Sequence, residues 1–356
     1  MSATPARFAS VDALRGLTVA AMLLVNTPGD WSHVYAPLLH APWHGLTPTD
    51  LVFPFFLFIV GVSIALGVVP RREAGVSRAV LRRAVVWRAA KIVALGLALH
   101  LLAFWLLDRP SFRPWGVLQR IGVCFAVAGL LAVYARPRTQ WALVVMVLVG
   151  YWALMAPWGY APFTHLAARL DTALFGPWLY QWDAVLERGQ DPEGLLSTLP
   201  AVVTTLLGVR AGAWLRQGDV RKVCLGGVVA LLVGLPWALV VPVTKALWTS
   251  SFVLVTAGFA MLALALAHVL VDRCGWPAIG RRFGVNAIAA YVGAAGMTYV
   301  LLAFGGMAFL YERGFAGWMT PVFGPYVPSL AFALAFVGLW WLVVWGMDRR
   351  GWYLKV

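Results

Sequence analysis

The sequence predicts a polytopic α-helical membrane protein with about ten spans, and three observations carry that prediction. Of the 356 residues, 62% are hydrophobic and only 12% are charged, which is about half the charged share of an average soluble domain. Apolar runs of roughly 20 residues recur along the chain, the length that a helix needs to cross about 30 Å of hydrocarbon. Basic residues gather in alternate loops between these runs, as the positive-inside rule requires.

The apolar runs can be placed to within a few residues. Helices are the only plausible form, because lipid cannot satisfy the hydrogen bonds of a free backbone. The first run contains Asp12 and Arg15 and is followed by no small-residue cleavage site, so we expect a retained span rather than a signal peptide. The expected spans are 10–27, 50–69, 85–107, 116–134, 140–156, 195–213, 223–241, 250–271, 284–304 and 326–346.

Charges in the loops predict the orientation. Loops on one side carry most of the arginines, whereas the opposite side carries most of the acids, among them Asp183 and Glu193. We therefore expect both termini in the cytoplasm. The formal net charge of +14 then reflects the basic cytoplasmic loops and does not indicate a nucleic-acid partner. The three cysteines lie far apart without a CxxC pair, which predicts neither a disulfide framework nor a metal site.

Two outer loops are long enough to form a site. Residues 28–49 hold three His, two Trp and four Pro, and residues 157–194 are rich in aromatic and acidic side chains. Neither loop has the composition of a disordered linker. We expect residues 1–356 to form a single transmembrane domain, with these two loops capping its site.

Polar groups at membrane depth are costly and therefore candidates for function. Asp12 and Arg15 lie on one helix face, where they form a local ion pair, bind a substrate phosphate or fix a neighbouring helix. Asp50 precedes an apolar run and has the position of a helix N-cap. Asn26 ends the first span, and His40 lies in the loop into the second, so both are on one side of the bilayer. A histidine there can accept a proton near neutral pH, and an amide can donate to an oxyanion.

Ordered sequence blocks are more specific than this periodicity. They resemble blocks of the heparan-α-glucosaminide N-acetyltransferase family and its bacterial relatives, and they cover the chain from residue 10 to about 295. The blocks are SVDALRG at 10–16, HAPWHGLT at 40–47, DLVFP at 50–54, GVLQR at 116–120, DPEGLL at 191–196, LGVRAG at 207–212, KALWTSS at 245–251, GVN at 284–286 and YVG at 291–293.

The resemblance implies transfer of an acetyl group from acetyl-CoA to the amine of a glucosamine. The catalytic histidine of the family stands directly before Ala-x-Trp, which selects His40 rather than His44, and its asparagine matches Asn26. Further residues match family positions or are costly in lipid. As contacts of CoA we expect Gln119, Arg120, Lys245, Asp12 and Arg15, and as contacts of the acceptor Asp50, Trp43 and Asn286, with no metal.

The chain also departs from the lysosomal members of the family. The spacing from Asn26 to His40 looks longer, and no large lumenal domain precedes the first span, so a small amino sugar is expected rather than a polymer. The resemblance further implies a homodimer and, for the bacterial branch, the inner membrane. Direct acetyl transfer is favoured over an acetyl-histidine intermediate, and both stay open.

A transporter of an amino sugar is the alternative, since intramembrane polar residues and helix-breaking Gly and Pro suit it equally well. A structural or regulatory membrane protein is a third and weaker interpretation. Binding and turnover of acetyl-CoA separate the enzyme from both.

Overall fold

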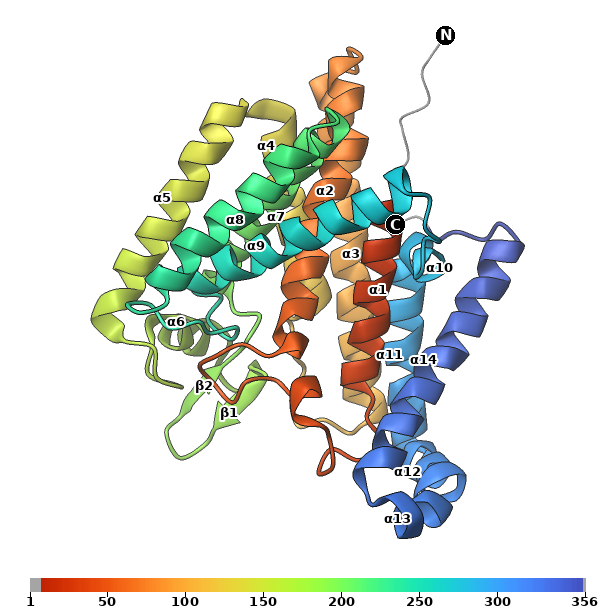
Figure 1. Ribbon diagram of the computed structural model, residues 1–356. Helices are drawn as coiled ribbons and strands as arrows, with labels where there is room; N and C mark the ends of the chain where they lie inside the picture. Colours follow the sequence, from red (N-terminus) through yellow and green to blue (C-terminus); the bar gives the residue numbers. More distant parts are fainter. Residues whose placement is uncertain (1–7, 355–356) are drawn as a thin grey trace.

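The computed structural model describes residues 8–354 and consists almost entirely of helices (Figure 1). The long helices are α1 (Ala9–Asn26), α2 (Val52–Glu73), α3 (Arg78–Leu106), α4 (Val117–Tyr134), α5 (Pro137–Met155), α7 (Leu195–Arg216), α8 (Val220–Trp237), α9 (Ser250–Ala267), α11 (Ala287–Ala303) and α14 (Tyr326–Arg349). Shorter helices are α6 (Leu166–Phe175), α10 (Arg281–Val285), α12 (Gly306–Tyr311) and α13 (Gly317–Phe323). Single turns are η1 (Ala36–Leu38), η2 (Pro48–Leu51), η3 (Ala156–Trp158), η4 (Gly176–Trp178) and the π-helical η5 (His268–Arg273) and η6 (Glu312–Ala316).

The membrane-spanning prediction is confirmed. Within residues 8–354, nine helices are long and apolar enough to cross a membrane, and the bent pair formed by α11 and the segment Gly306–Phe323 makes up to ten. In Figure 1 the first turn of α1 and the last turn of α14 lie at the same end of the bundle. An even number of crossings produces that arrangement, so it agrees with ten spans.

The ninth expected span, 284–304, is observed as α11, which begins at Ala287 because Asn286 separates it from α10. The sequence did not predict the bend of 95° that follows between Ala303 and Gly306. Gly305 makes the bend possible, because its φ of +68° is unfavourable for residues with a Cβ atom. The bend leads into a second helical segment, Gly306–Phe323, in which α12, the π-helical turn η6 and α13 follow one another without a break at the lower end of Figure 1.

Backbone contacts through glycine hold α2 against α7. A Cβ atom built on Gly61 of α2 would lie 1.9 Å from the carbonyl oxygen of Thr205. A Cβ atom on Gly208 of α7 would lie 2.0 Å from the carbonyl oxygen of Phe58. Small residues permit this close approach, which is how helices associate in lipid without a hydrophobic driving force. This close packing thus fixes the distance between the outer ends of the two helices.

The outer loops fold into a cap at the end of the bundle where α12 and α13 also lie (Figure 1). Helix α6 is followed by strands β1 (Gln181–Asp183) and β2 (Arg188–Gln190), which pair antiparallel with Trp182 opposite Gly189. The loop 28–49 is tied to the loop before α9, because Gly45 N–H donates to the carbonyl of Val243 at 2.8 Å. These connections bring side chains from distant parts of the sequence together.

Candidate functional site

His40 and Asp50 form the centre of the site. His40 Nδ1 lies 2.7 Å from Asp50 Oδ1. The side chain of His40 is 49% exposed, whereas that of Asp50 is 1% exposed. A buried carboxylate therefore holds one nitrogen of the imidazole ring, and the opposite side of the ring stays accessible.

Asp50 is fixed by the turn that starts α2. Its Oδ2 atom accepts hydrogen bonds from the backbone N–H groups of Ala41 and Thr47, each at 3.0 Å. Thr47, and not Asp50 as the sequence suggested, is the N-cap residue of this turn, and Asp50 occupies the third position of its capping box. The same carboxylate thus closes the turn and orients His40.

Lys245 completes the cluster from the loop before α9. Its Nζ atom lies 3.0 Å from His40 Nε2 and 3.9 Å from Asp50 Oδ1. The loop is held by Trp248, which is fully buried, has a φ of +51° and donates from Nε1 to Thr204. Such a conformation is strained for a bulky residue and persists only where the surroundings enforce it. Burial lowers the pKa of the Lys245 ammonium, which the charges of Asp50 and Glu193 partly counter.

The hydrogen bonds favour one tautomer of His40. An ionised Asp50 only accepts, so Nδ1 carries the proton and donates it to Oδ1. Nε2 then carries the lone pair, and the Lys245 ammonium lies 3.0 Å from Nε2 and 3.1 Å from Nδ1. A base whose remote nitrogen is oriented by a carboxylate has the geometry of a general base in acyl transfer.

His44 has a different environment, although it lies in the same short loop. Its Nδ1 atom lies 2.7 Å from Thr244 Oγ1, and this contact ties the loop 28–49 to the loop that carries Lys245. His44 does not line the cavity onto which His40 opens.

That cavity has a volume of about 470 Å³, within the range of small-molecule sites. Residues of both outer loops line it. The lining residues are His40, Ala41, Pro42, Trp43, Asp50, Pro162, Phe163, His165, Tyr180, Gln181, Gln190, Asp191, Pro192, Lys245 and Ala246.

His165 is a residue of this cavity that sequence reasoning missed. Its ring stacks on Trp43 with centroids 5.9 Å apart. Burial lowers the pKa of His165 to about 4, so the ring is neutral at pH 7. Ala168 N–H donates to Nδ1, which leaves the proton on Nε2, and among the described residues Nε2 has no hydrogen-bond partner. One lone histidine in an aromatic loop gives no sequence signal for this donor.

A network of acidic and basic side chains lies next to the cavity. Arg113 donates from Nε to Asp191 at 2.8 Å and from a terminal nitrogen to Glu193 at 2.6 Å. Burial opposes the charge of each group: it raises the pKa of Asp191, whereas for Glu193 the charge of Arg113 outweighs burial and lowers the pKa. Glu193 also interacts electrostatically with Arg120 and Lys245. The network thus connects the site to the start of α7.

Two predicted cofactor contacts, Arg120 and Gln119, lie inside the bundle and do not line the cavity of His40. Arg120 is fully buried, donates to the carbonyl of Gly194 and to Ser197, and lies over the ring of Trp248 at 5.2 Å. Within residues 8–354, its Nε and Nη1 atoms have no hydrogen-bond partner. Gln119 is also buried and lies near His100 of α3. Their predicted role in binding CoA stays a prediction.

Other predicted residues lie elsewhere along α1 and α11. Asn26 is exposed at the end of α1, next to the turn that carries Asp50. Asp12 and Arg15 pair at 3.0 Å near the opposite end of the helix, about 21 Å and about 17 Å from Asn26 at a rise of 1.5 Å per residue. Asn286 is buried between α10 and α11, and its amide has no hydrogen-bond partner in the described part of the chain. The structure brings together His40, Asp50, Trp43 and Lys245, and the other predicted residues do not line their cavity, although Asn26 lies close to it.

Fold and site together define the class of protein. It is a polytopic helical membrane protein whose outer cavity contains a histidine oriented by a carboxylate, and such a histidine can transfer protons. Within that class the chain belongs to the family described as heparan-alpha-glucosaminide N-acetyltransferase, catalytic, whose model matches residues 7–239. The resemblance predicted from the sequence blocks is thereby confirmed.

Two curated relatives carry the same name. The chain is 32% identical to heparan-alpha-glucosaminide N-acetyltransferase of Homo sapiens over 82% of its own length and 53% of the relative. It is 30% identical to the Mus musculus protein over 81% of its own length and 53% of the relative. The chain thus spans about half the length of the curated relatives that it matches. Family membership supports the acyltransferase class that the sequence predicted.

Proposed function

We propose that this protein is a membrane-embedded acetyltransferase that moves the acetyl group of acetyl-CoA to the amine of glucosamine or a related small amino sugar. The observation that carries the proposal is the cluster of His40, Asp50 and Lys245 at a cavity of ligand size. His40 is the residue that the family blocks select as the catalytic base. The names of the relatives support N-acetyl transfer to a glucosaminide, and acetyl-CoA is the donor that the sequence resemblance implies.

The proposed reaction is direct transfer. The neutral amine attacks the acetyl carbonyl carbon, the new C–N bond forms, and the C–S bond to CoA breaks. His40 Nε2 takes the proton that the nitrogen loses and returns it to the departing thiolate, so protons and electrons balance. Asp50 keeps the proton on Nδ1 and stabilises the imidazolium that forms in between.

Donors around the cavity would stabilise the oxyanion. The Lys245 ammonium occupies the position next to Nε2, from which it can turn to the carbonyl oxygen once the amine enters. Asn26 is the proposed second donor, by its match to the family asparagine. Trp43, Asp50 and the neutral His165 are proposed to surround the sugar, because they line the same cavity.

Binding of CoA is proposed to involve Lys245, Arg120 and Gln119, whereas Asp12 and Arg15 pair with each other at 3.0 Å and are proposed to join helices. Asn286 stays a proposed contact of the acceptor. Phosphate groups require cationic and amide partners, and Lys245, Arg120 and Gln119 supply them. Arg120 fits such a role in one respect, since two of its nitrogens have no partner within the described residues although the side chain is buried.

Release of the CoA thiol tests the proposal. Purified protein in detergent is mixed with acetyl-CoA and glucosamine, and free thiol is measured against samples that lack either substrate. We expect thiol release that depends on both. If the folded protein neither binds acetyl-CoA nor releases thiol, yet carries glucosamine across a vesicle membrane, the transporter interpretation replaces this one.

We further propose a multi-pass protein of a bacterial inner membrane with both termini in the cytoplasm, acting as a homodimer. A reporter active only in the cytoplasm is fused after residue 356 and, separately, after residue 180. The first fusion is expected to be active and the second silent, because the basic loops assign residue 180 to the outer side. The reverse result would overturn the orientation.

A further inference from the structure

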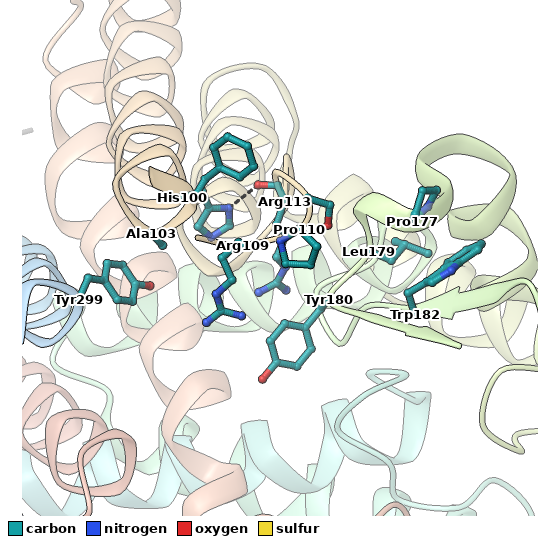
Figure 2. Close-up of a pocket in the computed structure, with 12 residues that line it drawn as sticks. His100, Ala103, Arg109, Pro110, Arg113, Pro177, Leu179, Tyr180, Trp182 and Tyr299 are labelled. Carbon is teal, nitrogen blue, oxygen red and sulfur yellow. Dashed lines mark hydrogen bonds between the residues drawn. The ribbon is translucent and has the colours of Figure 1, made fainter. Parts of the chain in front are cut away.

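An apolar groove runs along the side of the bundle between α5 and α8, with α7 and α9 as its floor (Figure 1). Its volume is about 510 Å³, within the range of ligand sites. The cavity of about 480 Å³ in Figure 2, at the outer end of the bundle, is lined by polar groups such as Arg109, Arg113 and Tyr180. Among the described residues that line the groove, in contrast, Lys222 alone is charged. The groove therefore suits a largely apolar occupant.

Both walls of the groove are fixed to its floor by direct contacts. A Cβ atom built on Gly227 of α8 would lie 3.0 Å from the carbonyl oxygen of Gly258, so α8 rests on the backbone of α9. On the other side, Ser250 Oγ of α9 donates to the carbonyl of Leu148 in α5 at 2.7 Å. Because each wall is held by the floor, the groove is formed before any occupant binds.

The two ends of the groove differ. At the outer end, Trp152 of α5 contacts Trp237 of α8 edge to face, with ring centroids 5.8 Å apart. At the inner end, Trp141 stacks on Trp214 of the floor at 6.0 Å, and α8 contributes Lys222. From Lys222 to Trp237, α8 rises about 22 Å at 1.5 Å per residue. The groove is thus closed by aromatic rings at its outer end and is cationic at its inner end.

Further basic side chains stand near the inner end. Lys222 pairs with Asp219 at 2.7 Å, and exposed pairs of this kind are weak. Arg221 is next to Lys222 in the chain, Arg138 precedes Trp141 by three residues, and both arginines are exposed. These three bases outnumber Asp219 on the side that the basic loops assign to the cytoplasm. The local charge therefore favours an anionic head group.

The shape of the groove favours a hydrocarbon chain over a protein helix. A helix with its side chains is about 10–12 Å across, whereas the walls converge until Trp152 meets Trp237. An acyl chain is much thinner, and the chains of one leaflet span about 15 Å, half of the roughly 30 Å of bilayer hydrocarbon. A groove of about 22 Å takes such a chain along its whole length, with the head group beside Lys222.

We propose that this groove binds one acyl chain of an anionic phospholipid of the inner leaflet. The phosphate lies at Lys222, Arg221 and Arg138, and the chain points toward Trp237. The groove shares no described lining residue with the cavity of His40, so the lipid takes no part in acetyl transfer. It joins α5 to α8, because both helices contact the same chain, and it stabilises the folded bundle by binding to it.

Native mass spectrometry with matched tryptophan substitutions tests the proposal. Protein freed of lipid in detergent is incubated with phosphatidylglycerol and washed, and the wild type is expected to retain one molecule per chain. Val145→Trp and Val229→Trp fill the groove from opposite walls and should each abolish this retention. Met146→Trp and Leu232→Trp change exposed residues of the same two helices that lie outside the groove, and they should retain the lipid. Equal retention in all four variants would overturn the proposal.

Two further probes identify the part of the lipid that is recognised. Phosphatidylglycerol should bind about fivefold more tightly than phosphatidylcholine with the same chains, the contribution of one basic residue near an anionic surface, and Lys222→Ala should remove that preference. Glycerol phosphate should not compete. Full competition would mean that the basic loops bind free phosphate, and the proposal would be wrong. It would also be wrong if Val145→Trp and Val229→Trp turned a dimer into monomers without affecting lipid retention, because a second copy would then cover the groove.

Discussion

The two ends of α1 each lie beside a paired charge, and the pairs differ in what surrounds them. Near the inner end, Arg15 bonds to Asp12, to the carbonyl of Gly284 and to Ser63 at 2.8 Å, so it connects α1 with α10 and α2. Near the outer end, His40 bonds to the buried Asp50 and opens onto a cavity. Costly polar groups in a membrane protein therefore serve either to join helices or to face a ligand, and the presence of a cavity separates the two uses.

The largest expected effect is at His40. His40→Ala should lower turnover about 10²–10⁴-fold, the usual contribution of general acid–base catalysis, while the thermal unfolding temperature and the affinity for acetyl-CoA stay near those of the wild type. His44→Ala is the matched control and should lose much less, because His44 faces Thr244 and not the cavity. Near-normal turnover in His40→Ala would show that the cluster of His40 and Asp50 near the outer end of α1 takes no part in the reaction.

Asp50→Asn should lower turnover about 10²-fold by changing the tautomer of His40. The asparagine oxygen can still accept from Ala41 and Thr47, but its NH₂ group would then face Nδ1 and favour protonation at Nε2. The measurement is the pH–rate profile of acetyl-CoA consumption. A purely structural role for Asp50 would lower the unfolding temperature and leave the profile of the remaining activity unchanged.

Arg15→Ala tests the inner end. We expect a lower unfolding temperature and a nearly unchanged KM for acetyl-CoA, because Arg15 ties together three helices. Arg15→Lys, which keeps the charge and loses the forked geometry, should be intermediate. A large rise in KM with normal stability would instead support the cofactor contact predicted from the sequence.

The smallest expected effect concerns Asp171 of α6, in the outer cap. Burial raises the pKa of Asp171 to about 6, above about 3.9 in an unfolded chain. Its contribution to stability is therefore present below about pH 4 and is lost as the pH rises through 6. The wild type should melt at a higher temperature at pH 5 than at pH 7.5, and Asp171→Asn should reduce this difference by a few degrees. An equal difference in both proteins would refute the assignment.

Much of the bundle could be predicted from the sequence, because hydropathy and loop charge are local signals. Ten apolar runs and their loops agree with the helices within a few residues at most positions. The bend at Gly305 and the helical segment of α12, η6 and α13 that follows it could not be predicted, since one glycine after an apolar run has many outcomes. The strands β1 and β2 are only three residues each and carry too little pattern to be recognised.

The sequence could indicate candidate site residues that stand in one motif, but it could not indicate contacts across the chain. His40, Asp50 and Trp43 follow from one stretch of sequence, and the family blocks select them. The contact of Lys245 with His40 spans 205 residues, so only the folded loops reveal it. His165 belongs to no block, and its importance depends on a cavity that exists only after folding.

The glycine contacts between α2 and α7 have a mechanical consequence. With atoms of one backbone packed directly against the other, the pair has no slack for sliding, and any added methyl group would have to push a carbonyl aside. We therefore expect the pair to move as one unit. The turn that contains Asp50 leads into α2, and Arg120 contacts Gly194 and Ser197 at the start of α7. Alternating access by movement along this seam is therefore blocked, and opening of the cavities falls to the loops that cap them.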